Sequence, residues 1–241
     1  MYISLKFQKA NIQNLMSKNS FKVLRPGINT TFQDLGRDNL YHVGLPFSGA
    51  IDKRNFLIAN SLITNKEDDA VLEFAYQGPL LEFSGSQTSI VITGNVNFKI
   101  IKKDTSEIKG ECYRTYDLNN KDCLDIISTE KSVYGYLSVK GGFKINKFCN
   151  SYSTTVRAEV GPNNGKKIEI GQSIILNTVD SAIEKRLEYF NSKIEFIRVI
   201  KGTNFDYFSE DSIKDFISKD FIVSKLTDRM GMRLNGPKIK N

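Results

Sequence analysis

Short segments that alternate apolar and polar residues, each closed by a turn, restrict the fold of this chain more than any other feature of its sequence. From residue 70 to residue 142 the side chains repeat with a period of two, and Gln77-Gly78-Pro79 and Ser84-Gly85-Ser86 supply two of the turns. The pattern predicts strands over residues 71–75, 80–83, 89–93, 96–102, 112–116, 123–127 and 134–139. Many short strands at nearly regular spacing favour an antiparallel barrel or sandwich, so we expect a mainly β protein.

The strand pattern resumes after Gly142 and predicts a second β unit. Residues 156–160 and 167–170 flank a glycine-rich turn with an Asn-Gly pair, which is typical of a β-hairpin. Further strands are expected over residues 21–24, 173–176, 194–200 and 221–224, with a polar connector over 179–191. Only two helices are expected, one after Asp52 as its N-cap and one over about residues 210–218. We therefore expect two barrel-like units that meet between about residues 140 and 190.

Charge and cysteine content exclude several classes of function. The net charge is +7, but the lysines are scattered and no recognised nucleic-acid motif occurs, so we expect no nucleic-acid partner. The three cysteines, Cys112, Cys123 and Cys149, fit neither a CxxC metal site nor an even set of disulfides, and a single histidine argues against a zinc site. Reduced thiols indicate a cytoplasmic protein. No apolar run approaches the roughly 20 residues of a membrane helix, so we expect no membrane contact.

Polar residues that folding alone does not require gather between residues 33 and 73. Gln33 to Arg37 read QDLGR, His42 is the only histidine, and the segment that ends at Asp52 reads PFSGAID. Glycines in this stretch permit tight backbone paths, and loops of this kind are where binding and catalytic residues concentrate. The stretch is therefore the candidate site, with eight candidate residues: Gln33, Asp34, Arg37, His42, Ser48, Asp52, Asn60 and Glu73.

Each candidate has a chemical role and a plainer structural one. The guanidinium of Arg37 can hold an anion, and the imidazole of His42 can transfer a proton. The side-chain amides of Gln33 and Asn60 can form hydrogen bonds with the amide group of a substrate. The carboxylates of Asp34, Asp52 and Glu73 can orient these groups or act as bases. The structural alternatives are an Asp34–Arg37 pair across a turn, Asp52 as a helix cap, a hydrogen-bonded His42, a Glu73–lysine pair, and Ser48 as a turn residue outside any GxSxG motif.

The same motifs resemble those of a known family. From residue 23 the chain reads VLRPG, TTFQDLGR, His42 and GLPFSGAID, followed by Ala59-Asn60, Leu72-Glu73 and Gly78-Pro79. In order and spacing they are similar to the opening of the biotin-dependent carboxyltransferase family, which includes allophanate hydrolase subunit 2 and the C-type subunit of 5-oxoprolinase. The segments GGF and SYST between residues 141 and 154, and DRMGMRLNGP at residues 228–237, extend the resemblance over about residues 21–237.

The resemblance implies a fold of two cyclophilin-like β-barrel units with a few short helices. Residues 21–142 would form the first subdomain, residues 143–241 the second, and residues 1–20 an N-terminal extension, with Met16 as an alternative start. Segments that family members carry after the RLNGP motif are missing, so we expect either an incomplete second barrel or a sequence that is a fragment. Where the family reads LGSR, this chain reads Cys149-Asn150-Ser151-Tyr152, which removes an arginine.

The resemblance also implies a subunit that handles a small amide. It implies a hydrolase subunit of an ATP-dependent 5-oxoprolinase, or of a related carboxyltransferase or allophanate hydrolase-type complex, active only within the complex. Its partners would be a subunit-1-like protein, which corresponds to the B-type component of 5-oxoprolinase, and a lactam-hydrolase-type subunit. No P-loop occurs, so ATP would be contacted in another way or bound by a partner, and biotin would take part in a carboxyltransferase. The alternative is a non-catalytic, partner-binding protein that antagonises a kinase inhibitor.

If the chain is an enzyme subunit, the candidate residues divide into two groups. We expect His42, Asp34 and Arg37 to be catalytic, because the reaction develops negative charge on oxygen and moves a proton at nitrogen. The expected substrate-binding residues are Gln33, Ser48, Asp52, Asn60 and Glu73. Arg37 and His42 are further expected to lie in one concave site formed by residues 33–60.

Overall fold

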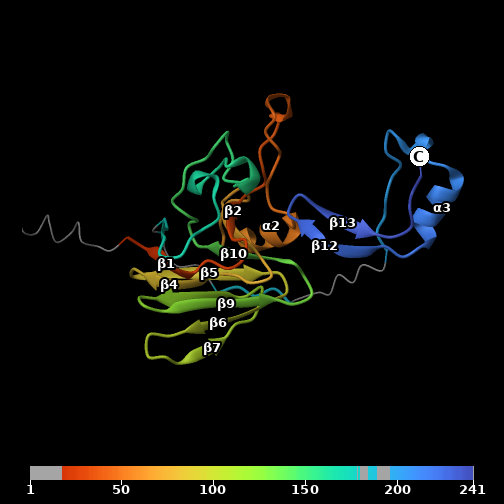
Figure 1. Ribbon diagram of the computed structural model, residues 1–241. Helices are drawn as coiled ribbons and strands as arrows, with labels where there is room; N and C mark the ends of the chain where they lie inside the picture. Colours follow the sequence, from red (N-terminus) through yellow and green to blue (C-terminus); the bar gives the residue numbers. More distant parts are fainter. Residues whose placement is uncertain (1–17, 178, 180–183, 189–195, 241) are drawn as a thin grey trace, which may run out of the picture. The chain divides into compact units, whose positions relative to one another are not determined.

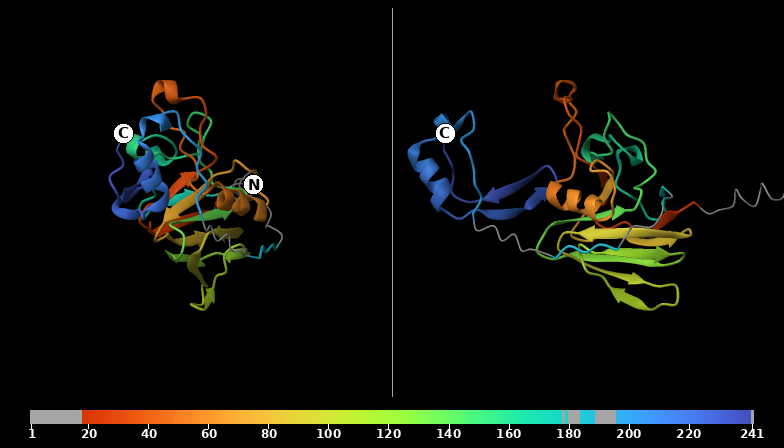
Figure 2. Two further views of the ribbon diagram at one scale, coloured as in Figure 1. Left: turned by 90° about the vertical axis from the view of Figure 1, so that its right-hand side faces the viewer. Right: turned by 180° about the vertical axis from the view of Figure 1, so that it is seen from behind.

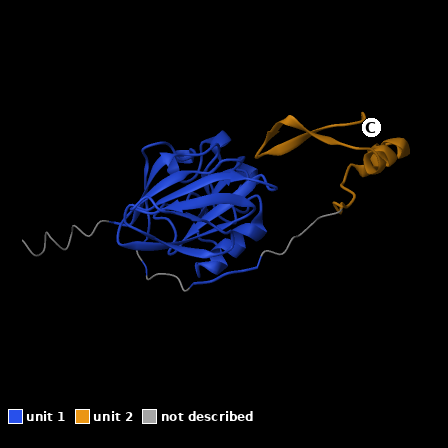
Figure 3. Cartoon of the chain, turned by 90° about the horizontal axis from the view of Figure 1, so that it is seen from below, with its two compact units in different colours: residues 1–189 blue, residues 190–241 orange. Residues whose placement is uncertain are grey.

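The structure, a computed structural model, describes residues 18–177, 179, 184–188 and 196–240. The chain forms two compact units, residues 1–189 and residues 190–241 (Figure 3). Strands dominate and helices are few, which confirms the expectation of a mainly β protein (Figure 1). The predicted subdomain limit between residues 142 and 143 stays a prediction, and residues 143–189 lie in the first compact unit. In the part of the chain that the structure describes, no helix is long and apolar enough to cross a membrane.

The first sheet has six strands in the order β11-β1-β4-β9-β6-β7, and every neighbouring pair is antiparallel. In Figure 1 the strands β1, β4, β9, β6 and β7 follow one another down the sheet. Because β11 pairs with β1, the chain after residue 142 is tied into the same sheet as the first strand. The bounds are β1 Ser20–Arg25, β4 Leu80–Ser84, β6 Val96–Ile101, β7 Glu107–Lys109, β9 Cys123–Thr129 and β11 Ser173–Ile175.

The second sheet has five antiparallel strands in the order β2-β3-β10-β5-β8. Its register places Glu73 of β3 between Thr31 of β2 and Tyr136 of β10. This sheet therefore brings the candidate residues near residue 33 next to the candidate at residue 73. The bounds are β2 Thr31–Gln33, β3 Val71–Ala75, β5 Gln87–Thr93, β8 Thr115–Asn119 and β10 Tyr134–Val139.

The main apolar core lies between these two sheets. Side chains alternate between buried and half-buried along β4 and β6, so each strand gives one face to the core. Phe21 and Leu81 from the first sheet share one buried cluster with Leu72 and Leu137 from the second. The period-two pattern of β4 and β6 thus corresponds to one buried face on the first sheet.

Helix α2, Lys53–Leu62, covers the opposite face of the second sheet. Its Phe56 is buried with Val71, and its Ala59 with Val91. The side-chain Oδ1 of Asp52 accepts a hydrogen bond from the backbone N–H of Asn55 at 3.0 Å, which confirms the predicted N-cap. This second layer explains why every residue of β3 is buried, since both of its faces are covered.

The unit of residues 190–241 contains, in its described part, a 3-10 turn, one helix and one two-stranded sheet. Helix α3, Glu210–Ser218, has the predicted bounds, and the Ser209 hydroxyl accepts from the backbone N–H of Ser212 at 3.2 Å. The sheet pairs β12, Ile222–Asp228, with β13, Gly231–Asn235, and the turn η4 spans Phe205–Tyr207. Residues 196–200 form no strand, so that part of the strand predicted over 194–200 is wrong, while residues 194 and 195 lie outside the described residues.

The hairpin predicted over residues 156–170 is also wrong. The structure has two 3-10 turns there, η2 (Val156–Ala158) and η3 (Asn163–Gly165). The backbone N–H groups of Thr154 and Ile168 donate instead to the carbonyls of Phe32 and Thr30, at 2.9 and 3.0 Å. Within the stretch, the N–H groups of Glu159, Gly165 and Lys166 bond inside the two turns, so the segment around β2 satisfies only its end at Ile168.

The strand predicted over residues 112–116 begins later, at Thr115 of β8. Tyr113 has φ of +63°, a left-handed conformation that a regular strand does not contain. Its ring is buried with Ala59 and Val91, and its hydroxyl donates to Asn55 Oδ1 at 2.8 Å. Tertiary contacts of the Tyr113 side chain thus accompany the local break in the strand.

The two-layer core predicts a clear contrast between buried and exposed apolar residues. Leu72 is 0% exposed, so Leu72→Ala should lower the free energy of unfolding by about 2–5 kcal/mol through lost burial and a cavity. Ile108, on β7, is 41% exposed, and Ile108→Ala should cost a small fraction of that. Urea unfolding of both variants measures the difference, and equal losses would contradict the assignment of the core.

Candidate functional site

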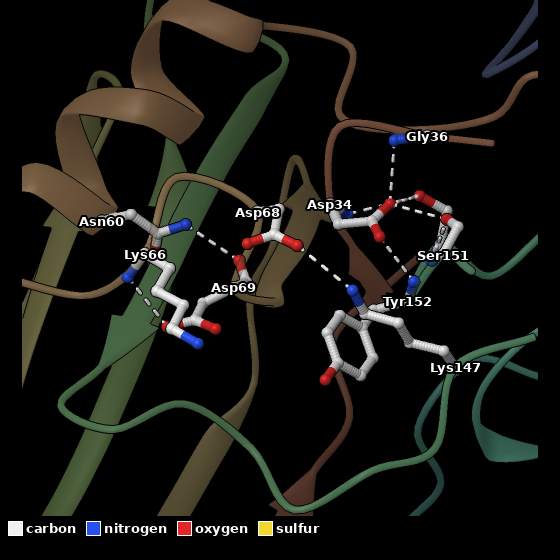
Figure 4. Close-up of polar contacts among 10 residues, drawn as sticks. Asp34, Gly36, Asn60, Lys66, Asp68, Asp69, Lys147, Ser151 and Tyr152 are labelled. Carbon is white, nitrogen blue, oxygen red and sulfur yellow. Dashed lines mark hydrogen bonds and ion pairs between the residues drawn. The ribbon is translucent and has the colours of Figure 1, made fainter. Parts of the chain in front are cut away.

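The Asp34 carboxylate, just after β2, is the centre of a buried polar network. Its Oδ1 accepts from the backbone N–H of Gly36 at 2.8 Å and from the hydroxyls of Ser151, at 2.7 Å, and Ser153. Its Oδ2 accepts from the backbone N–H of Tyr152 at 2.5 Å (Figure 4). The side chain is almost fully buried, and these bonds offset the cost of removing a charge from water. Asp34 thereby fixes the 151–153 segment against the turn after β2.

Arg37 lies under the same segment and is 2% exposed. Its Nη1 donates to Thr155 Oγ1 at 3.1 Å, and its Nη2 donates to the carbonyl of Ser153. The guanidinium carbon lies 5.8 Å from the centre of the Phe148 ring, within the range of a cation–π contact. Its Nε has no hydrogen-bond partner among the described residues. One buried donor of a cation is therefore left for another group.

The charge of Arg37 is influenced by its neighbours but not by a direct ion pair. Burial lowers the pKa of Arg37, while its electrostatic interactions with Asp34 and Cys149 oppose that shift. Among the ion pairs within 4.0 Å in the described part of the chain, none joins Arg37 to Asp34. The direct pair across a turn is therefore not formed. Asp34 and Arg37 instead hold the same segment through separate hydrogen bonds.

Gln33 and Ser48 complete this group. The Gln33 side chain is fully buried, and its Nε2 donates to Thr31 Oγ1 and to the Thr154 carbonyl, both at 2.9 Å. Its Oε1 has no partner among the described residues. The Thr155 hydroxyl donates to Ser48 Oγ at 3.1 Å. We refer to Gln33, Asp34, Arg37 and Ser48, with residues 151–155, as the Asp34 cluster.

Two glycines allow the backbone of the cluster to close tightly. Gly36 has φ of +99°, and a Cβ at that residue would lie 2.8 Å from the carbonyl oxygen of Phe47. Gly49 has φ of +82°, and a Cβ there would lie 2.9 Å from the backbone of Leu35. Side chains at either position would separate the two arms of the loop. The glycines of QDLGR and SGAID thus serve the close approach of residues 35–36 to residues 47–49.

A second polar group joins Glu73 to the start of helix α2. Glu73 Oε2 accepts from the backbone N–H of Ile51 at 2.9 Å and from the Tyr136 hydroxyl at 3.0 Å. That hydroxyl also accepts from the backbone N–H of Asp52 at 2.7 Å. Burial and the Glu73 charge raise the pKa of Tyr136, so the phenol stays protonated and donates. Asp52 and Glu73 are thus linked through Tyr136, a residue that the sequence did not single out.

Asn60 and His42 lie apart from both groups. Asn60 Nδ2 donates to the Asp69 carbonyl and its Oδ1 accepts from the Ser138 hydroxyl, so this buried amide fixes the loop after α2 (Figure 4). His42 is exposed in the turn η1, Tyr41–Val43, at the tip of a loop that stands away from the sheets (Figures 1 and 2). Within the described residues its side chain makes no hydrogen bond or ion pair. The structure therefore does not bring His42 to Arg37, and their shared site stays a prediction.

Three candidate-site residues that the sequence did not predict lie in the 151–155 segment of the Asp34 cluster. Ser151, Ser153 and Thr155 supply hydroxyls to Asp34, Arg37 and Ser48. Ser151 and Ser153 lie in the SYST motif of the family resemblance, whereas Thr155 follows it and had no sequence signal. In the described part of the chain, no group of three or more His, Cys, Asp or Glu side chains is placed to hold a metal ion.

Comparisons with known proteins agree with the sequence motifs. A family model described as the carboxyltransferase domain, subdomain A and B, matches residues 43–241. The urea amidolyase of Saccharomyces cerevisiae is 28% identical over 92% of this chain, which spans 12% of that protein. The C-type 5-oxoprolinase subunit of Haemophilus influenzae is 28% identical over 86% of this chain, which spans 65% of its length. A crystal structure of the K. lactis urea amidolyase aligns over 97% of this chain and 15% of its own, with 25% identity and a TM-score of 0.79.

The hydrogen bonds of Asp34 predict a large cost for removing its charge. Asp34→Asn leaves one amide N–H facing buried donors, and should lower the free energy of unfolding by on the order of 3 kcal/mol. Asp104 also accepts two hydrogen bonds, from the N–H and the hydroxyl of Ser106, but on the surface. Asp104→Asn is the matched control and should change stability far less. Chemical denaturation of both variants tests the contrast, and a stable Asp34→Asn protein would show that the network is not held by the carboxylate.

Proposed function

This chain belongs to the family of carboxyltransferase domains, subdomains A and B, and from that premise we propose that it is a hydrolase-type subunit of a 5-oxoprolinase complex. Its substrate would be a small cyclic amide that also carries a carboxylate, opened from 5-oxo-L-proline to L-glutamate with consumption of ATP. The resemblance to a C-type 5-oxoprolinase subunit over 86% of the chain supports this choice. The chain spans less than two thirds of the length of that relative. The activity of a whole 5-oxoprolinase complex, with this chain as one subunit, is therefore proposed.

The observation that carries the proposal is the pair of buried polar atoms without partners in the Asp34 cluster. Arg37 Nε is an unpaired donor on a cation, and Gln33 Oε1 is an unpaired acceptor, both on side chains at most 2% exposed. A lactam with a carboxylate offers the complementary groups, an anionic acceptor for Arg37 and an N–H donor for Gln33. Buried polar atoms without a partner need an explanation, and a substrate that enters the cluster would supply the missing hydrogen bonds.

The remaining candidates take supporting roles in this proposal. Asp34 is a positioning residue, because its carboxylate oxygens already accept from Gly36, Ser151, Tyr152 and Ser153. Ser48 is proposed to contact substrate at the mouth of the cluster. His42, on its exposed loop, is proposed to transfer a proton at the surface that faces a companion protein.

ATP does not fit the Asp34 cluster. A triphosphate is held by several donors with a metal ion, whereas Arg37 is the single cation in this cluster and no metal-binding group occurs among the described residues. We therefore assign ATP to a companion protein of the complex. The hydrogen bonds described above already engage the side chains of Asp52, Asn60 and Glu73 within the fold. A substrate contact at these three residues is therefore the least supported part of the proposal.

A second candidate reaction is carboxyl transfer to an open amide. The alignment with a urea amidolyase, over 92% of this chain, supports it. Biotin supplies a carboxyl group in such transfers, and Arg37 is the residue in this cluster that would hold a carboxylate. The partner-binding alternative, antagonism of a kinase inhibitor, requires the fold but not the unpaired atoms of Arg37 and Gln33.

Reconstitution with companion subunits distinguishes these functions. We expect the purified chain alone to show no ATP hydrolysis that depends on 5-oxoproline, and activity to arise with a subunit-1-like and a lactam-hydrolase-type protein. Arg37→Lys should lower kcat/KM by at least about tenfold, since Lys cannot reproduce the guanidinium fork. Arg157→Lys, at an exposed arginine of η2, is the matched control and should change nothing.

Co-elution on size exclusion separates loss of assembly from loss of chemistry. An Arg37→Lys chain that assembles normally and retains full activity would contradict the role of Arg37. Assembly without any 5-oxoproline-dependent turnover, combined with biotin-dependent carboxylation of urea, would replace the first reaction by the second. Assembly without either reaction would favour the partner-binding alternative.

A further inference from the structure

A hollow of about 270 Å³ opens in the unit of residues 1–189, and it shares no residue with the Asp34 cluster. Four separate segments form it: the turn between β5 and β6, the residues before β8, the end of β9, and the short stretch 186–188. The volume suits a ligand of a few heavy atoms, near the lower limit of small-molecule sites. Its acidic lining residues are Glu111, Glu130 and Glu188, and the apolar ones used below are Val96, Tyr113 and Leu187.

The floor of the hollow is apolar and held in place. Tyr113 and Val96 are 6% and 8% exposed, and Leu187 packs against the cluster that contains Tyr113. The backbone N–H of Leu187 donates to the Tyr113 carbonyl at 2.9 Å, which ties the 186–188 stretch to the floor. The Tyr113 hydroxyl donates to Asn55 Oδ1 and accepts from the N–H of Gly94. A ligand would therefore meet a preformed surface.

The thiol in the floor contributes packing rather than reactivity. Cys112 Sγ donates to the Val96 carbonyl at 3.2 Å. Burial raises the pKa of Cys112 to about 11, and the nearby Glu130 carboxylate acts in the same direction. A neutral thiol is a poor nucleophile, so the chemistry of the hollow is binding.

The rim carries three carboxylates, of Glu111, Glu130 and Glu188, and one guanidinium, that of Arg186. Glu111 is paired with Arg186 at 3.5 Å and with Arg114 at 3.9 Å. Glu130 accepts from the neutral Asn97 amide at 2.6 Å and has no ion pair within the described residues. Glu188 has neither a hydrogen bond nor an ion pair in the same part of the chain. Two carboxylates without counter-ions thus line one hollow in a chain whose net charge is +7.

We propose that this hollow is a binding site for a small organic cation of the alkylammonium class. The ammonium group donates to the carboxylates of Glu130 and Glu188, and the alkyl stem covers Val96, Tyr113 and Leu187. Two carboxylates repel an anion of the same size, and a neutral alcohol lacks the charge that they attract. A bare metal ion would leave the apolar floor uncovered. The site is independent of the proposed 5-oxoprolinase reaction, because no group of the Asp34 cluster takes part.

Titration of the full isotope-labelled chain with putrescine, followed by NMR, tests the proposal. We expect saturable shifts of the amide signals of Asn95, Val96, Tyr113 and Leu187, with a dissociation constant on the order of 1 mM. n-Butylamine should shift the same signals, whereas n-butanol and butyrate at equal concentration should not. Ionic strength is matched with potassium chloride throughout, since exposed charge pairs are screened by salt.

Charge-removing variants decide whether the rim carboxylates carry the binding. Glu130→Gln and Glu188→Gln should each weaken putrescine binding about tenfold, which corresponds to the loss of one charge-assisted contact. Glu107→Gln, at an exposed glutamate that pairs with Lys99 outside the hollow, is the matched control and should leave binding unchanged. Thermal melting of each variant verifies that it folds, and Glu188→Gln keeps the test intact if Glu130→Gln is unstable.

Three outcomes would overturn the proposal. The first is the absence of saturable shifts in the wild-type chain, and the second is equal binding of n-butanol. The third is unchanged putrescine binding when both Glu130 and Glu188 are replaced by glutamine. Slower alkylation of Cys112 by iodoacetamide in the presence of putrescine, in a chain with Cys123→Ser and Cys149→Ser, would be independent support, because Cys112 lines the hollow.

Discussion

The buried carboxylate of Asp34 is the interaction on which the rest of the candidate site depends. A charge removed from water must be compensated by hydrogen bonds, and Gly36, Ser151, Tyr152 and Ser153 supply them. These bonds fix the segment that in turn accepts from Arg37 and Gln33. The positions of a buried cation and a buried amide therefore follow from the satisfaction of one carboxylate.

Much of the fold could be predicted from the sequence because its strands are short apolar or alternating runs that end at turns. Residues 71–75 and 134–139 form strands with the expected bounds, and helices α2 and α3 begin after the expected caps, Asp52 and Ser209. The hairpin predicted over residues 156–170 is wrong for a local and a distant reason. Most backbone N–H hydrogen bonds there close tight turns within the stretch, and the N–H of Ile168 pairs with Thr30, more than a hundred residues away, a contact that leaves no local periodicity.

The candidate site was predictable in its residue types but not in its geometry. Gln33, Asp34, Arg37 and Ser48 do gather, because two glycines bring their loop arms together. A sequence shows that a side chain is polar, but it does not show which buried donor that side chain will meet. The hydrogen bonds by which Tyr136 links Glu73 to Asp52 could therefore not be predicted from the sequence. The exposure of His42 likewise follows from the direction of a projecting loop, which the local sequence does not encode.

The spacing of the Asp34 contacts along the chain has a consequence for folding kinetics. Asp34 and Ser151 are 117 residues apart, and Gln33 and Thr154 are 121 apart. Closing such a loop carries an entropic cost that only the intervening strands can offset, and structures rich in distant contacts fold slowly. The hairpins between these residues can assemble from local contacts, whereas the cluster needs both ends of the unit. We therefore expect the candidate site to be among the last parts of the molecule to form, so that a nascent chain interrupted before residue 151 contains the QDLGR motif but not the environment that buries it.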